Sequence, residues 1–241
     1  RNLKSLKTDC HPLANIIYGV NGSGKTSLLE AIYLLGRGRS FRHRDLRLVV
    51  NHQAEELVVS AKIEKGMPAK VHQMGVRRTS SGKFAARFDG KTLQSSVQLA
   101  SELPLQLIDA HSFNLLEGGP SQRRQFLDWG VFHVEQTYGD VWKRFQKALK
   151  QRNQLLRHGR IEEESLSAWT AELVPLSEQV SRLRDKYLSG LVKHVREVAR
   201  LFDGLGSLDI EYYQGWSAET ALAEVMSGDK KRDFSVGTTS H

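Results

Sequence analysis

A glycine-rich run near the start of the chain has the residues of a phosphate-binding loop. Gly19, Gly24, Lys25 and Thr26 fit the pattern G-x-x-x-x-G-K-[ST]. In such a loop the glycines let backbone N–H groups surround an anion, the lysine reaches the β- and γ-phosphates, and the threonine hydroxyl binds Mg²⁺. We therefore predict a nucleoside triphosphate and Mg²⁺ as ligands, Thr26 as the magnesium ligand, and a nucleotide-binding loop made of eight consecutive residues: Gly19, Val20, Asn21, Gly22, Ser23, Gly24, Lys25 and Thr26.

Two elements must hold this loop in place. Residues 15–18 are short, apolar and rich in isoleucine, which predicts a buried parallel strand. After the loop, Leu28, Leu29, Ile32 and Leu35 fall at helical spacing. The expected helix would direct the positive end of its dipole at the bound anion. This strand–loop–helix context favours a phosphate-binding loop over a chance match.

The acidic residues that hydrolysis requires are harder to find. An ATPase of this kind needs an apolar strand ending in Asp, which holds magnesium and places the attacking water. Residues 105–109 come nearest, but Gln106 interrupts the apolar run. Residues 116–120 resemble an ABC-type signature loop, yet Glu117 would repel a phosphate and Pro120 lacks an N–H donor. We predict no catalytic residue in this chain, which would bind ATP without hydrolysing it.

Other chemistries find no support in the sequence. The nine histidines and the single cysteine form no H-E-x-x-H and no Cys/His metal-binding spacing. A G-x-S-x-G nucleophile motif is missing from the 241 residues, which disfavours a hydrolase of that class. The guanine-reading N-K-x-D motif is also missing, which counts against a GTPase.

Five arginines follow the predicted helix within eleven residues, interleaved with aromatic side chains, at positions Arg37, Arg39, Arg42, Arg44 and Arg47. Arginine clusters suit phosphate backbones, and the chain has a formal net charge of +8. We predict sequence-independent DNA binding through Arg37, Arg39, Arg42 and Arg44. Two alternatives stay open: a solvated basic loop, or arginines that brace the nucleotide site.

Length and composition describe an ordinary globular protein. The 241 residues, 39% of them hydrophobic, suffice for one or two domains. No apolar run approaches 18 residues, the first ten residues are polar and basic, and Cys10 is the only cysteine. We expect a cytoplasmic protein without a membrane anchor. The chain starts with arginine and stops in strand-like sequence, so we also expect it to be a fragment.

Residues 1–118 are predicted to form an α/β lobe of the P-loop NTPase type. Short, partly alternating runs indicate an antiparallel β meander, with strands at 46–50, 56–63, 69–78 and 83–90. Another buried strand is expected at 102–110. Gly118 and Gly119 mark a break, and Pro120 or Ser121 should open a helix.

Residues 119–204 are predicted to form a helical hairpin that interrupts this lobe. One helical segment spans 121–157, and residues 157–164 form the expected turn. The second segment carries an apolar stripe at alternating spacings of three and four, made of Leu166, Trp169, Leu173, Leu176, Val180, Leu183 and Tyr187. Strand-like runs at 207–213 and 233–239 then predict that residues 205–241 begin the returning lobe.

Three blocks of sequence, at 19–42, 115–133 and 147–153, resemble the RecF family, whose members are SMC/Rad50-like, ABC-type ATPases. The resemblance implies a split ATPase lobe with its signature and Walker B motifs farther along the chain. It also implies an ATP-dependent head-to-tail homodimer, binding to double-stranded and gapped DNA, and a RecR-type partner. Ala110 and His111 stand where the family often has Pro-Glu, which places any nucleotide-sensing role there in doubt.

Three functional hypotheses follow. The first is an ATP-dependent DNA-binding protein of recombinational repair, replication-fork maintenance and the DNA-damage (SOS) response, which helps to load recombinase and whose full-length form is a weak DNA-stimulated ATPase. The second is a non-catalytic DNA-binding or interaction module with a purely structural P-loop. The third, a P-loop kinase with the helical insert as a lid, is disfavoured because the insert is long and heptad-like.

Overall fold

The computed structural model describes residues 3–43, 45–157, 163–204 and 208–240. These residues form two compact units, Arg1–Ile108 and Asp109–His241. The first combines helices with an antiparallel sheet and the second is helical, which confirms the mixed fold class. The domain boundaries predicted at 118/119 and 204/205 remain predictions.

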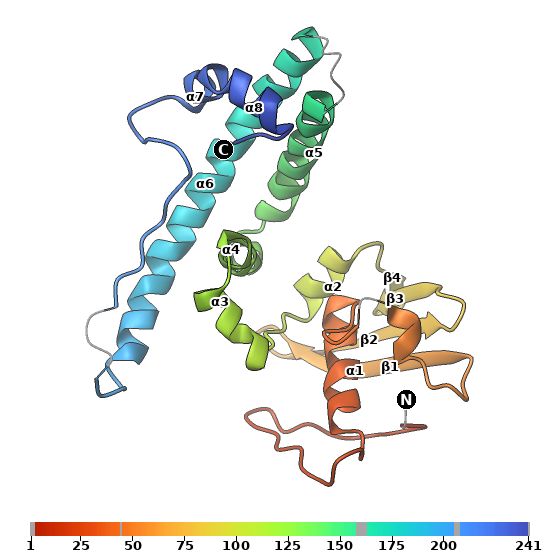
Figure 1. The fold of residues 1–241 in the computed structure, drawn as a ribbon. Helices are drawn as coiled ribbons and strands as arrows, with labels where there is room; N and C mark the ends of the chain where they lie inside the picture. The colour runs from red at the N-terminus through yellow and green to blue at the C-terminus, as the bar shows by residue number, and fades with distance from the viewer. Residues whose placement is uncertain (1–2, 44, 158–162, 205–207, 241) are drawn as a thin grey trace. The chain divides into compact units, whose positions relative to one another are not determined.

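The first unit is built around a four-stranded antiparallel sheet in the order β1-β2-β3-β4 (Figure 1). Its strands are Glu56–Lys65, Lys70–Thr79, Phe84–Phe88 and Lys91–Thr92. Val59 pairs with Val76, which pairs in turn with Ala86. Because side chains alternate along a strand, these registers place one apolar face of the sheet on the core. The meander predicted at 56–63, 69–78 and 83–90 is confirmed.

Two helices cover that apolar face. Helix α1 spans Lys25–Arg37 and helix α2 spans Ser96–Glu102. The core they share with the sheet consists of Leu34, Leu35, Met74, Val76, Ala86 and Leu99. At Gly36 an added Cβ would lie 2.7 Å from the carbonyl oxygen of Leu103, so α1 also packs closely on the segment that follows α2. The predicted helix after the glycine-rich loop is therefore present and anchored at its C-terminal half.

Three strands predicted for this unit are absent from its described residues. Residues 15–18 form no strand, and Ile16 and Tyr18 are 88% and 90% exposed. Residues 46–50 instead contain the 3₁₀ helix η1, Leu46–Val49, because the side chain of Asp45 accepts a hydrogen bond from Arg47 N at 2.9 Å and caps it. The run at 102–110 contains no strand, and Ile108 is exposed.

The second unit begins with the short helices η2, Ala110–Phe113, and α3, Asn114–Glu117. Helix α4, Pro120–Val134, starts at the predicted proline. Helix α5, Tyr138–Arg157, and helix α6, Glu163–Ala199, run antiparallel beside one another (Figure 1). The predicted stripe on α6 is confirmed, with Leu166, Leu173, Leu176 and Val180 buried. Most of the predicted turn lies outside the described residues.

The single helix expected over 121–157 is divided between α4 and α5. The break between the two helices lets the start of α5 lie beside Asp128 of α4. The Asp128 carboxylate accepts hydrogen bonds from the Tyr138 hydroxyl, from Trp142 Nε1 at 3.3 Å and from Arg184 Nε at 2.7 Å. In an unbroken helix Tyr138 would stand about 15 Å along the axis from Asp128. Burial raises the pKa of Tyr138, so the phenol stays a hydrogen-bond donor.

Helices α7, Leu222–Gly228, and α8, Lys230–Val236, close the second unit. The strand predicted at 233–239 is wrong, because α8 continues to a left-handed C-cap at Gly237, with φ 71°. Residues 208–213 of the other predicted strand are extended without strand pairing. Leu222 and Met226 join the core of α4, α5 and α6.

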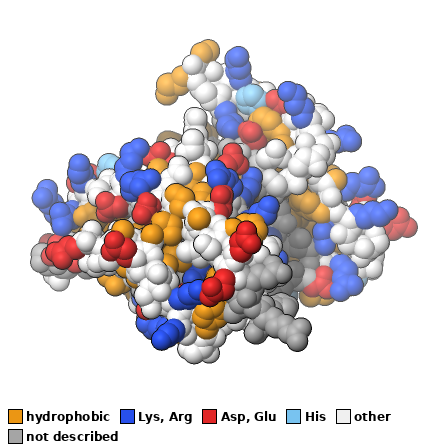
Figure 2. Space-filling model, turned by 90° about the horizontal axis from the view of Figure 1, so that it is seen from above, with side chains coloured by type: hydrophobic (Ala, Val, Ile, Leu, Met, Phe, Trp, Pro, Cys, Tyr) orange, Lys and Arg blue, Asp and Glu red, His pale blue; other side chains and the backbone are white. Residues whose placement is uncertain are grey.

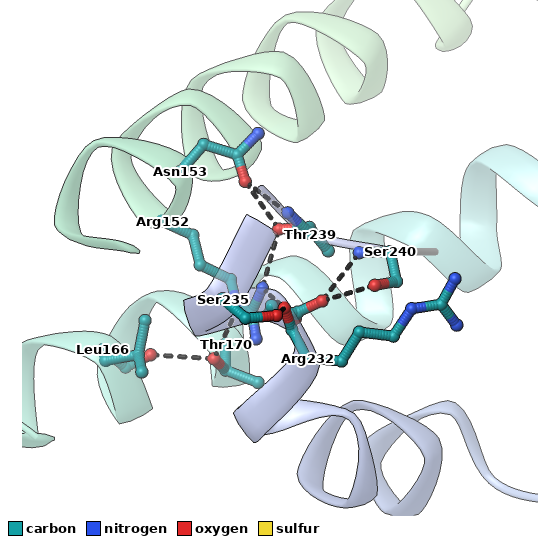
Figure 3. Close-up of polar contacts among 9 residues, drawn as sticks. Arg152, Asn153, Leu166, Thr170, Arg232, Ser235, Thr239 and Ser240 are labelled. Atoms are coloured by element: carbon teal, nitrogen blue, oxygen red, sulfur yellow. Dashed lines mark hydrogen bonds and ion pairs between the residues drawn. The ribbon is translucent and has the colours of Figure 1, made fainter. Parts of the chain in front are cut away.

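A buried polar network fixes the last described residues (Figure 3). Arg152 on α5 donates to Asp233 Oδ2 at 2.8 Å, and both side chains are only 1% exposed. The same guanidinium donates to Thr239 Oγ1 at 2.7 Å and Thr170 Oγ1 at 3.1 Å. Asp233 also accepts hydrogen bonds from the backbone and side chain of Ser240. Three segments far apart in sequence thus meet on one ion pair.

None of the helices in the described ranges combines the length and apolar character needed to cross a membrane.

We expect Arg152→Ala to lower the free energy of unfolding by about 3–5 kcal/mol, because it leaves the Asp233 carboxylate buried without its cation. Arg144 is the matched control: it also lies on α5 and pairs with an acidic residue, Glu172, but both side chains are exposed. Arg144→Ala should cost no more than about 1 kcal/mol. Urea unfolding followed by circular dichroism measures both, and equal losses would contradict the assignment of Arg152 as the anchor.

Candidate phosphate-binding site

The glycine-rich loop runs directly into α1. Gly24 is the N-cap of the helix in the left-handed conformation, with φ 99°, and Leu28 N donates to Gly24 O at 3.0 Å. Gly22 is also left-handed, with φ 82°. A Cβ added at Gly24 would come within 2.8 Å of Leu3 Cδ2. The left-handed backbone conformation therefore requires glycine at position 24, whereas the Leu3 side chain could move aside.

Lys25 is the first residue of α1, and its side chain folds back over the loop. Its Nζ donates to the carbonyl oxygens of Gly19 at 2.7 Å and Val20 at 2.9 Å. The ammonium group thus lies against the loop and beside the helix N-terminus, where the helix dipole also favours an anion. The sequence-predicted loop residues Gly19 to Thr26 are brought together as one turn.

Thr26 stands exposed on the first turn of α1. Across the described ranges, no group of three or more His, Cys, Asp or Glu residues is arranged to hold a metal ion. Mg²⁺ strongly prefers to keep several waters and to bind through substrate phosphates rather than a protein cage. One hydroxyl beside a phosphate loop fits that chemistry, and Thr26 as the magnesium ligand remains a prediction.

A cavity of about 410 Å³ borders α1 on the side of the segment that leads into β1. Ser27, on the first turn of the helix, lines it together with Asn51 and Gln53. Its volume falls within the usual range of small-molecule pockets.

The four arginines predicted to bind DNA separate into different environments. Arg37 is half-buried, lies 5.9 Å from the centroid of the Tyr33 ring, and has its pKa lowered by burial. Arg39 and Arg42 are exposed, and Arg44 lies outside the described residues. Arg37 therefore packs within the fold, and two described arginines of this set reach solvent.

The fifth arginine of the cluster, Arg47, forms an ion pair with Asp45. Arg47 donates to both carboxylate oxygens of Asp45, through Nε at 3.0 Å and Nη2 at 2.7 Å. Hydrogen bonds from the Arg47 side chain and backbone lower the pKa of Asp45 to about 2. This pair is electrically neutral at physiological pH.

The acidic residues weighed as hydrolytic groups lie in the second unit and serve local structure. Asp109 caps η2, where its side chain accepts from His111 N at 2.9 Å. The described residues 103–108, which lead directly into it, form no strand, whereas a Walker B aspartate would end one. Glu117 ends α3, and Arg123 donates to Gly118 O at 2.8 Å in the turn that follows. This turn is a loop before a helix, as the sequence predicts.

The two units differ sharply in charge. Residues 1–108 carry 17 Lys and Arg against 8 Asp and Glu, a net charge of +9, whereas residues 109–241 carry 18 against 19, a net charge of −1. The whole excess of positive charge therefore belongs to the unit with the phosphate loop. On the face shown in Figure 2, basic side chains alternate with acidic ones and form no continuous basic field.

Sequence reasoning missed a buried acidic residue on α1. Glu30 accepts a hydrogen bond from the Ser40 hydroxyl and is only 3% exposed. A signal was available, because Glu30 falls three residues after Ser27 and four before Leu34, on the helix face that turns toward the core.

Comparison with known proteins gives one family. A family model described as the RecF/RecN/SMC N-terminal domain matches residues 1–232. Curated proteins named DNA replication and repair protein RecF are similar along 99% of the chain: that of Azotobacter vinelandii is 46% identical over 239 residues, and that of Marinomonas sp. is 42% identical over 241. The chain spans about 65% of the length of these relatives.

Solved structures share the fold. One is described as the recombination mediator protein RecF-ATPrS in the RecFOR pathway, and it matches 92% of this chain with a TM-score of 0.81 at 22% identity. A second, RecF-ATP of the same pathway, matches with a TM-score of 0.77 at 21% identity. This chain covers 62% of each of those chains.

Proposed function

The chain belongs to the RecF/RecN/SMC N-terminal domain family, and on that premise we propose that it is the ATP-binding part of a DNA repair and replication protein. The observation that carries this proposal is the left-handed glycine turn of residues 19–24, closed by Lys25 at the N-terminus of α1. The similar solved structures, described as RecF-ATPrS and RecF-ATP, support the choice of nucleotide.

In this proposal the loop residues divide the work of binding. The backbone N–H groups of the glycine turn donate to the phosphate oxygens, which can approach the backbone closely because glycine carries no side chain of its own. Lys25 exchanges its contacts with the Gly19 and Val20 carbonyls for the β- and γ-phosphates. Thr26 would offer its hydroxyl to Mg²⁺, whose charge would offset the negative charge of the phosphates.

We propose that this chain alone binds ATP without turnover. The two acidic residues that stand nearest the hydrolytic motifs, Asp109 and Glu117, belong to short helical elements of the second unit. Asp109 uses its carboxylate to cap a helix. The weak ATPase activity implied for the whole protein would then require residues of the remaining third of its relatives' length.

DNA binding is assigned to the first unit. Its net charge of +9 and the exposed Arg39 and Arg42 supply positive charge without any recognition-helix motif. Such a surface contacts phosphates rather than base edges, so binding should be independent of sequence. We propose double-stranded and gapped DNA as ligands, and recombinase loading at single-strand gaps as the process served.

The assembly is likewise a proposal. The similar solved structures are described as a recombination mediator of the RecFOR pathway. A RecR-type protein is therefore the partner we propose, together with an ATP-dependent homodimer. The second hypothesis, a module whose P-loop is only structural, differs in one respect: it requires no nucleotide binding.

Lys25→Ala should weaken binding of ATP and Mg²⁺ by at least about tenfold, since a charge-assisted contact to phosphate contributes roughly 1.5–3 kcal/mol. Lys62→Ala, on an exposed position of β1, is the control and should bind as the wild type does. Isothermal titration calorimetry measures both. Unchanged affinity in Lys25→Ala would favour the structural P-loop.

Removing Arg39 and Arg42 together should reduce the slope of log affinity against log salt by up to about 1.8, because each phosphate contact on duplex DNA contributes roughly 0.9. The control variant Lys143→Ala/Arg144→Ala removes the same charge from exposed positions on α5. Fluorescence anisotropy across a salt series gives the slope. A wild-type slope combined with weaker ATP binding would show that these arginines brace the nucleotide instead.

A further inference from the structure

The carboxyl group of Glu30 is buried in the middle of α1, five residues beyond Lys25. It accepts a hydrogen bond from Ser40 Oγ, a residue of the arginine-rich segment that follows the helix. Burying a carboxyl group is costly unless hydrogen bonds compensate it. The Ser40 hydroxyl supplies such a hydrogen bond, so this contact ties the segment after α1 to the middle of the helix.

Ser40 also fixes the backbone of the residues that follow it. Its Oγ accepts hydrogen bonds from the backbone N–H groups of Arg42 and His43, both at 3.0 Å. One hydroxyl thereby donates to α1 and accepts twice from its own loop. The peptide from Ser40 to His43 is thus fixed in direction relative to Glu30.

Two further contacts tie the same loop to α1. Gly38 reverses the chain in the left-handed conformation, with φ 64°, and its N–H donates to Leu34 O at 2.8 Å. Phe41 then meets the Tyr33 ring edge to face, with centroids 5.4 Å apart. Arg42 is exposed although both of its sequence neighbours are half-buried. The loop therefore presents this arginine outward from a fixed base.

The base of the loop lies under the phosphate site. Thr26 and Glu30 are four residues apart in α1, so they share one face of the helix. The helix rises about 6 Å between them. The turn beginning at Ser40 is consequently docked one helical turn below the residue we assign to Mg²⁺.

We infer that Glu30 and Ser40 are positioning residues, which orient Arg42 toward a phosphate ligand by fixing its loop to the nucleotide-binding helix. This inference rests on the proposed function for the ligand, because a phosphate of DNA and a phosphate of the nucleotide present the same chemistry to a guanidinium. The geometry assigns the orientation, and the two sources are separated by experiment.

The test compares Ser40→Ala, Ser40→Thr, Glu30→Ala, Glu30→Gln and Arg42→Ala. Each variant is titrated with a DNA duplex across a salt series and with ATP and Mg²⁺, and unfolded by urea. We expect Ser40→Ala and Glu30→Ala to reproduce most of the Arg42→Ala defect. If DNA is the ligand, that defect is a slope of log affinity against log salt that is lower by up to about 0.9. If the nucleotide is the ligand, the defect is an ATP affinity that is lower by about tenfold. Threonine keeps the hydroxyl and glutamine keeps an acceptor, so both should retain wild-type binding.

Each outcome decides the matter. If Ser40→Ala binds both ligands normally while Arg42→Ala is impaired, the positioning role is overturned and the proposed function stands. A loss of unfolding free energy with unchanged salt slope and ATP affinity identifies a merely structural contact, which also overturns it. If Arg42→Ala itself is normal in both titrations, the loop binds no phosphate and the inference fails, whereas Lys25→Ala still tests ATP binding separately. Should the alanine variants not fold, a defect in the Thr or Gln variant would contradict the inference.

Discussion

The first unit depends on how α1 is anchored. Leu34 and Leu35, near its C-terminal end, are buried against β2, β3 and α2, while its first turn remains open to solvent. Burial of this kind contributes roughly 1.5–3 kcal/mol for each large apolar side chain. A helix fixed at one end by the core can hold its other end rigid without any cap, and Gly24 indeed makes no side-chain cap. The N–H groups of the first turn are therefore not occupied by a side-chain cap from Gly24.

Local signals in the sequence determined more of this structure than long-range ones did. Each of three confirmed features can be recognised from a short stretch of sequence. They are the glycine pattern, the alternation along β1 to β3 and the heptad stripe of α6. The strand expected at 15–18 is different, because a buried parallel strand requires neighbours on both sides. Its residues can be apolar and still lie exposed when no described strand flanks them, as Ile16 and Tyr18 do.

Polar side chains account for the other differences. Asp45 turns an apolar run into a 3₁₀ helix by capping it, and Asp128 accepts hydrogen bonds from three side chains on α5 and α6 where the chain breaks between α4 and α5. At 233–239 a helix ends at Gly237, a C-cap signal that strand-like composition concealed. None of these polar partners is evident from hydrophobic periodicity, since Arg152 and Asp233 are 81 residues apart. The buried Glu30 differs, because its spacing from Leu34 already places it on the core-facing side of α1.

The same logic separates binding from chemistry in the candidate site. A phosphate loop needs only contiguous backbone and one lysine, so a single short segment specifies it, and residues 19–26 suffice. Hydrolysis needs an acidic strand and a signature loop brought from elsewhere, and the segments nearest to them in sequence, at 105–109 and 116–120, are used for capping and for a turn. Charge follows the division, with a net +9 on the unit that holds the phosphate loop and −1 on the helical unit. The capacity to hold polyphosphate is therefore local to one unit, whereas the capacity to cleave it would have to be assembled.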